Sequence, residues 1–131
     1  CADLSGASLV NANGRNTGFN EANLSNTDLR GCDLSQATMF GADLRAARLS
    51  GADLTGAYLL FADLSQVVGW REIKSIRCAN IYGVDAPFGF KEWALKRGAL
   101  QYEWDDSSEW KEACKACMEA LEQETKLGLG D

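Results

Sequence analysis

The stretch GADLRAARLSGADLTGAYLLFADL, residues 41–64, places a leucine at every fifth position. A helix repeats about every 3.6 residues and a strand every two, so neither element explains this spacing. The same phase extends over residues 2–66, which hold thirteen consecutive units of the form A-(D/N)-L-x-x. Within them, only Gly14 lacks a large apolar side chain at the leucine position. Such a regular repeat predicts a solenoid in which every unit forms the same structure.

A unit of five residues fits one edge and corner of a square coil. The central leucine then points to the axis with the alanine beside it, while the Asp or Asn and the last two residues face water. Four units complete a coil, and coils stack at the ordinary strand spacing of about 4.8 Å. The predicted core consists of the large residues in phase: Leu4, Leu9, Phe19, Leu24, Leu29, Leu34, Met39, Leu44, Leu49, Leu54, Leu59 and Leu64.

The repeated A-(D/N)-L-x-x unit resembles the pentapeptide-repeat family. The resemblance implies an all-β solenoid, a right-handed quadrilateral β-helix, of about three to four coils here. It covers residues 2–66 strongly and continues more weakly through residues 79–83, which are shifted in phase by two residues. The motif is specific for the fold and says almost nothing about function.

The C-terminal half predicts helices. Residues 67–78 interrupt the repeat, and Pro87 marks a break. The segment FKEWALKRG, residues 90–98, predicts a short helix that stops at Gly98. A second helix is expected over about residues 108–126, and its apolar face has helical spacing. The predicted organisation is a β-helix over residues 1–86, regular to residue 66 and degenerate after it, with an α-helical C-terminal cap of the same domain over 87–131. In related proteins a loop and a helix of this kind close the end of the coil.

Composition argues against several classes of function. The chain has 131 residues, a net charge of −6 and no histidine. The acidity disfavours a nucleic-acid partner, and the longest apolar run, residues 57–62, is far too short for a membrane span. Without histidine there is no Ser-His-Asp or Cys-His arrangement, and there is no glycine-rich phosphate loop. The column of Asp3, Asn23, Asp43 and Asp63 suits corner turns better than a calcium site. We therefore predict no catalytic, cofactor or metal site, and no enzyme.

The cysteines allow three interpretations. Cys114 and Cys117 form a C-x-x-C motif, which is a thiol-redox signature in some folds. Here it lies inside the second helix, away from the N-terminal dipole that lowers a thiol pKa. Alternatively, Cys78 forms a structural disulfide with Cys114 or Cys117, or the cysteines are buried free thiols. A disulfide would indicate a bacterial, extracytoplasmic compartment such as the periplasm or the thylakoid lumen, and free thiols a cytoplasmic one.

A candidate interaction patch comprises Phe40, Tyr58, Leu60 and Phe61, which occupy outward positions where the repeat normally has polar or small residues. Phe40 and Leu60 are twenty residues apart and so belong to adjacent coils. Apolar patches of this kind rarely face water. Either the chain's own C-terminal helix covers the patch, or it is the interface with a protein partner or with a second copy in a homodimer.

These observations favour a non-catalytic structural or protein-interaction module with an unknown protein partner. The resemblance adds an alternative, because some pentapeptide-repeat proteins mimic duplex DNA and bind a topoisomerase. The short stack, the basic residues Arg30, Arg45 and Arg48, and the large cap depart from those proteins. The second alternative is a thiol-redox protein that uses Cys114 and Cys117.

Overall fold

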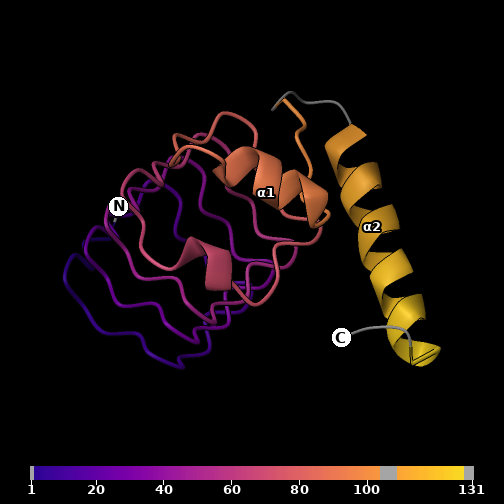
Figure 1. Ribbon diagram of the computed structural model, residues 1–131, viewed down its shortest axis with the longest axis horizontal. Coiled ribbons are helices and arrows are strands. Elements are labelled where there is room, and N and C mark those ends of the chain that lie inside the picture. The colour runs from indigo at the N-terminus through magenta and orange to yellow at the C-terminus, as the bar shows by residue number, and fades with distance from the viewer. Residues whose placement is uncertain (1, 104–108, 129–131) are drawn as a thin grey trace.

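The computed structural model describes residues 2–103 and 109–128 and shows a stack of coils with two α-helices packed on it (Figure 1). Neighbouring coils are joined by single parallel β-bridges between residues twenty positions apart, as in the column Asp3, Asn23, Asp43 and Asp63. Four five-residue units therefore complete one coil, and the coils form a quadrilateral β-helix. The bridges do not lengthen into long strands, because a corner follows every few residues.

Each corner is a tight turn that follows the inward leucine. In the first unit the Ala7 amide donates to the Leu4 carbonyl oxygen at 2.9 Å, and Gly6 has a left-handed φ of 72°. A left-handed third residue is typical of a type II turn. The Asp3 carboxylate accepts a hydrogen bond from the Ser5 amide at 3.0 Å. This bond explains why Asp or Asn precedes the inward position in most units, since a short polar side chain satisfies a corner amide.

The core is the inner lining of the coils. The inward leucines from Leu24 onward are at most 2 % exposed, and the alanines beside them are equally buried. Leu4, Leu9 and Phe19 are only partly buried, because no coil lies before the first one. Gly14 is buried, and a Cβ added there would meet Leu34 Cδ2 at 3.1 Å, so Leu34 fills the space that Gly14 leaves.

The interruption of the repeat is a two-residue insertion in one corner. Arg48 pairs with Val68 at the usual spacing of twenty, but Asp53 pairs with Ser75, twenty-two positions away. The short 3-10 helix η1 (Trp70–Glu72) lies between these pairs and takes up the extra residues. The insertion therefore shifts the phase without ending the stack.

The coils continue beyond the regular repeat. Tyr58 pairs with Asn80, and Asn80 pairs with Leu100. The first pair matches the two-residue phase shift expected for residues 79–83. The stack thus has four coils and part of a fifth, which is more than the three to four expected, because residues after 66 keep the backbone bonds although they lose the sequence motif.

The helices occupy two different places. Helix α1 (Phe90–Lys96) buries Phe90 and Ala94 completely against the core at the end of the stack. The Trp70 ring from η1 lies 5.6 Å from the Phe90 ring and 5.6 Å from the Trp93 ring, so the insertion supplies an anchor for α1. Helix α2 (Glu109–Lys126) runs beside the coils as a separate rod (Figure 1), and none of its residues is fully buried. Residue 108, where this helix was expected to begin, lies outside the described residues.

Candidate functional site: the face beneath helix α2

Helix α2 crosses one side face of the solenoid and touches it at several points. The Trp110 ring lies 5.7 Å from the Tyr58 ring and 6.5 Å from the Tyr102 ring. One turn from the other end, Glu124 pairs with Arg77 of the fourth coil. The amphipathic stripe expected from the sequence therefore faces the solenoid rather than α1.

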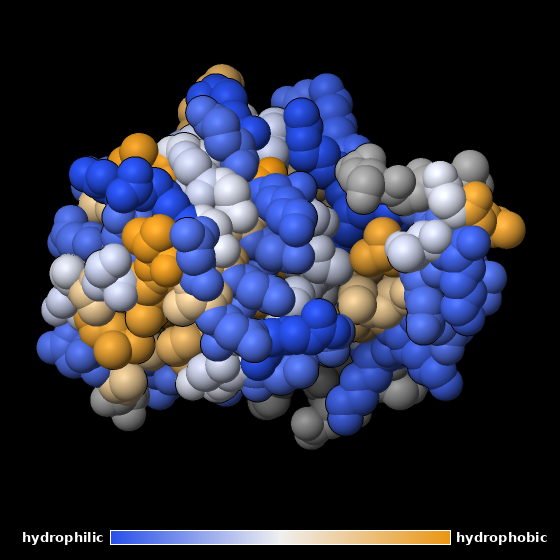
Figure 2. Space-filling view, turned by 90° about the horizontal axis from the view of Figure 1, so that it is seen from below, coloured by the Kyte–Doolittle hydropathy of each residue, from blue (hydrophilic) through white to orange (hydrophobic). Residues whose placement is uncertain are grey.

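The helix does not close down on this face. A cleft of about 400 Å³ remains between them, lined by Thr38, Tyr58, Leu60, Tyr102, Trp110 and Cys114 among others. A second cleft, of about 660 Å³, lies between residues of the second and third coils and Met118 and Leu121 of the helix. Figure 2 shows apolar side chains gathered where α2 meets the coils, while hydrophilic side chains cover most of the outward surface of α2. Contact is thus sparse, and both facing surfaces are partly apolar.

One disulfide fastens α2 to the solenoid. Of the two pairings that the sequence allowed, the structure contains Cys78–Cys117, whose Cα atoms are 5.7 Å apart and which are 39 positions apart in sequence. Cys114 is a free, half-buried thiol in the cleft, and burial raises its pKa. Cys32 is a free thiol buried at an alanine position of the repeat, and burial raises its pKa also. The two cysteines of the C-x-x-C motif are therefore not bonded to each other.

The four residues of the candidate patch lie in two environments. Leu60 is completely buried, and Tyr58 is half-buried in the cleft facing α2. Phe40 is half-buried and Phe61 is 50 % exposed. The chain's own helix therefore covers one part of the patch, and another part still faces solvent.

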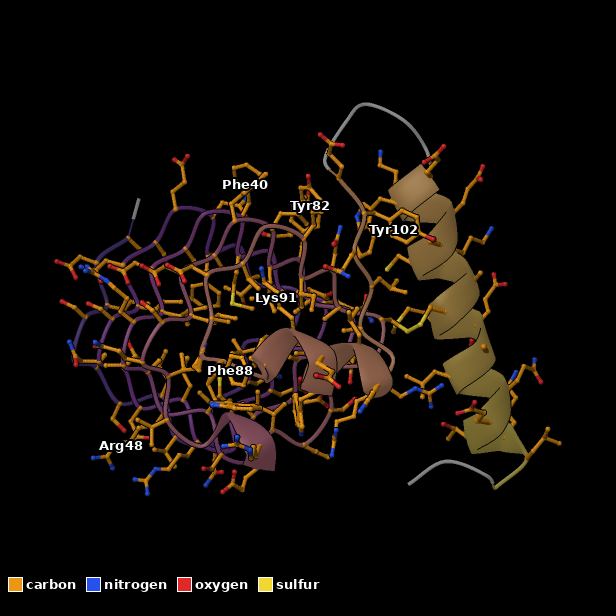
Figure 3. All side chains as sticks on the ribbon, turned by 45° about the horizontal axis from the view of Figure 1, so that its top comes forward. Phe40, Arg48, Tyr82, Phe88, Lys91 and Tyr102 are labelled. Carbon is orange, nitrogen blue, oxygen red and sulfur yellow. A yellow bond between two sulfur atoms is a disulfide. The ribbon has the colours of Figure 1, made fainter. Side chains whose placement is uncertain are left out.

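The exposed residue Phe61 belongs to an aromatic ladder made of Phe40, Phe61 and Tyr82. The Phe61 ring lies edge-to-face with both neighbours, 5.7 Å from Phe40 and 5.7 Å from Tyr82. Figure 3 shows Phe40 and Tyr82 along one edge of the molecule, with Tyr102 beyond them. Sequence reasoning missed Tyr82, although the two-residue phase shift of its unit places it in the column of Phe40 and Leu60.

Phe61 occupies a corner of the coil. Its φ of 57° lies in the left-handed region, as at other non-glycine corners such as Gln36 and Cys78, so this conformation belongs to the turn. The corners on either side of it in the same column are Gly41 and Gly83. A Cβ added to Gly83 would lie 2.5 Å from Phe61 Cδ1, so the Phe61 ring rests over a position that must stay glycine. This geometry holds the ring at the surface.

The Asp carboxylates of the repeat accept hydrogen bonds from residues of the corner turns. The Asp33 carboxylate accepts from the Ser35 amide at 3.0 Å and from its hydroxyl at 2.6 Å, and these bonds lower the pKa of Asp33. Asp43 accepts from the Arg45 guanidinium at 2.7 Å, which lowers the pKa of Asp43. Within the described residues, no three His, Cys, Asp or Glu side chains are grouped so as to hold a metal ion. The carboxylates are thus accounted for by backbone structure.

Comparison with known proteins identifies the class of protein that this fold defines. The sequence model of the pentapeptide repeats matches eight copies, over residues 1–36 and 32–68. The chain therefore belongs to the pentapeptide-repeat family, as the sequence motif predicted, and pentapeptide-repeat proteins fold as right-handed quadrilateral β-helices.

Solved structures of the family are similar to this chain. The pentapeptide repeat protein Rfr23 from the cyanobacterium Cyanothece 51142 is 27% identical with a TM-score of 0.51, over 77% of this chain and 58% of that one. A pentapeptide repeat protein from Nostoc Pcc 7120 is 29% identical with a TM-score of 0.40, over 76% and 84% of the two chains. One from the Arabidopsis thaliana thylakoid lumen is 22% identical with a TM-score of 0.34, over 83% of each. The chain thus spans 58% of the length of Rfr23, and no curated protein matches it significantly.

The disulfide and the helices are relevant to the cellular compartment of the protein. A disulfide is compatible with an oxidising, extracytoplasmic compartment. Among residues 2–103 and 109–128, neither helix combines the length and the apolar character that crossing a membrane requires.

Proposed function

We propose that this chain is a non-catalytic protein-interaction module whose protein partner contacts the aromatic ladder of Phe40, Phe61 and Tyr82. The observation that carries the proposal is Phe61, an aromatic residue that is 50 % exposed at a corner of the coil, where the repeat normally has a polar or small residue. Pentapeptide-repeat proteins are generally structural modules without catalytic activity, which supports the non-catalytic part of the proposal.

The ladder has the composition of an interface centre. Aromatic residues are enriched in the fully buried core of protein interfaces, and they dominate the binding energy there. Burying the exposed half of a Phe side chain removes roughly 100 Å² of apolar surface from water, which contributes about 2 kcal/mol. Phe40 and Tyr82 hold the ring from both sides, so little side-chain entropy remains to be lost on binding. The disulfide supports placing this interaction in an oxidising compartment such as the periplasm or the thylakoid lumen.

The variant Phe61→Asn tests the proposal. Asn occupies the same left-handed corner at Asn11, Asn16 and Asn26, so the substitution keeps the corner and removes the ring. The matched control is Val68→Ser, which removes a residue that is 55 % exposed and lies in another column. Partners are captured with the full-length protein from cells of the source organism, and self-association is followed by sedimentation.

We expect Phe61→Asn to weaken the specific complex by more than about tenfold, in line with the roughly 2 kcal/mol above, while Val68→Ser leaves it unchanged. Loss of a dimer in the purified protein would identify the partner as a second copy. A Phe61→Asn protein that keeps every partner and the oligomeric state of the wild type would refute the proposal.

A further inference from the structure

Three cysteines lie close together where α2 crosses the solenoid, and one of them, Cys114, is a free thiol. Cys78 and Cys117 form the disulfide, and Cys114 lines the adjoining cleft as a free thiol. Cys114 precedes Cys117 by three positions in the same helix. A free thiol one helical turn from a disulfide is the arrangement that thiol–disulfide exchange requires.

Cys114 and Cys117 can pair after a local change in helix α2. Side chains three positions apart on a helix have Cβ atoms about 5–6 Å apart, whereas a disulfide requires about 3.5–4.5 Å. Pairing therefore requires the turn of α2 between the two cysteines to tighten locally. Cys117 is half-buried, whereas Cys78 is completely buried in the solenoid. The Cys117 sulfur is therefore the accessible end of the existing bond.

The disulfide is also the strongest attachment of α2. No residue of the helix is fully buried, and clefts of about 400 and 660 Å³ lie under it. The remaining contacts include the Arg77–Glu124 ion pair, which is partly exposed, and the rings around Trp110. Exposed ion pairs contribute little to stability, so the covalent bond largely decides whether α2 stays on the face.

We propose that Cys78, Cys114 and Cys117 form a thiol–disulfide exchange site that fastens or frees helix α2. The Cys114 thiolate attacks Cys117 Sγ, the Cys114–Cys117 bond forms, and the Cys78–Cys117 bond breaks. Cys78 leaves as a thiolate and takes up the proton that Cys114 lost. The number of disulfides and of electrons is unchanged, so the step consumes neither oxidant nor reductant. Its product has a disulfide within α2 and no covalent link between α2 and the solenoid.

Freeing the helix would uncover the apolar face beneath it. Tyr58, Leu60 and Tyr102 line the cleft under α2, and the Tyr58 ring already stacks 6.3 Å from the Phe40 ring. A protein thiol or a small thiol such as glutathione can trigger the same change by attacking Cys117, after which Cys114 displaces it. The exchange site does not depend on the partner proposed above.

Peptide mapping distinguishes the two disulfides directly. Trypsin cleaves after Arg77, Lys111 and Lys115, so the three cysteines fall on three separate peptides. The full-length protein is equilibrated in glutathione buffer, quenched in acid, alkylated and digested without reduction. We expect linked peptides for both Cys78–Cys117 and Cys114–Cys117, and loss of hydrogen-exchange protection across α2 in the fraction that holds the second bond.

Two variants separate the exchange from general reduction. In Cys114→Ser, release of the Cys78 thiol at low glutathione concentration should slow by about tenfold or more, because only attack by glutathione from solution remains and the intramolecular route is lost. Cys32→Ala, which restores the alanine of the repeat, should behave as the wild type. Absence of the Cys114–Cys117 peptide from the equilibrated wild type would overturn the proposal, as would equal rates of Cys78 release in Cys114→Ser and Cys32→Ala.

Discussion

Substituting alanine for a leucine should cost more in the middle of the stack than at its open end. Leu44 is 1 % exposed and lies between Leu24, 0 % exposed, and Leu64, 1 % exposed, in the same column. The backbone around it is tied to both neighbouring coils: the Leu44 amide donates to Asp63 at 2.8 Å and the Leu24 amide donates to Asp43 at 2.7 Å. These hydrogen bonds fix the spacing between neighbouring coils. The cavity left by Leu44→Ala therefore cannot collapse.

We therefore expect Leu44→Ala to lower the free energy of unfolding by about 3–5 kcal/mol, the upper part of the range for buried leucines. Leu4 is only partly buried and has a coil on one side alone, so Leu4→Ala should cost roughly 1–2 kcal/mol. Urea unfolding followed by far-UV circular dichroism measures both. Equal losses for the two variants would refute a stack with a loosely packed first coil.

Two further predictions concern the corners. Gly14 is not in a left-handed conformation, but an added Cβ would lie 3.1 Å from Leu34 Cδ2 and 3.2 Å from the Asp33 carbonyl oxygen, so Gly14→Ala should lower stability slightly. Gly31→Ala should lower it more, because Gly31 has a φ of 68° and an added Cβ would lie 2.1 Å from Asn11 Oδ1. Urea midpoints of the two variants compare them, and a larger loss for Gly14→Ala would contradict the structure. The pKa values of Asp33 and Asp43 are held below their ordinary value of 3.8 by hydrogen bonds. The stability that these carboxylates contribute is complete above the unfolded pKa and is lost as the pH falls through the folded pKa. The urea midpoint should therefore fall below about pH 4, and a midpoint that stays constant from pH 6 to pH 3 would show that these bonds contribute nothing.

The repeat let the sequence determine most of the fold. Each unit contacts its neighbours in the stack through the same few positions, so the five-residue period alone gives the coil, the column of Asp3 and Asn23, and the leucine core. The positions of α1 and α2 also followed from local signals, because helix periodicity and the stop at Gly98 act within a few residues. The sequence underestimated the number of coils, since residues 79–85 and 98–100 keep the backbone bonds of the stack after the motif has faded.

The site depended on contacts between residues far apart in the chain. The sequence identified Phe40, Tyr58, Leu60 and Phe61 together, but only the position of α2 shows that Leu60 is buried while Phe61 is half exposed. The sequence likewise left Cys114 and Cys117 as equal candidates for Cys78. Which sulfur meets Cys78 depends on how α2 is rotated and placed on the solenoid face, where Trp110 packs near Tyr58 and Glu124 pairs with Arg77. Periodicity says which residues share a face of a helix, but only tertiary contacts decide which of them reaches a given partner.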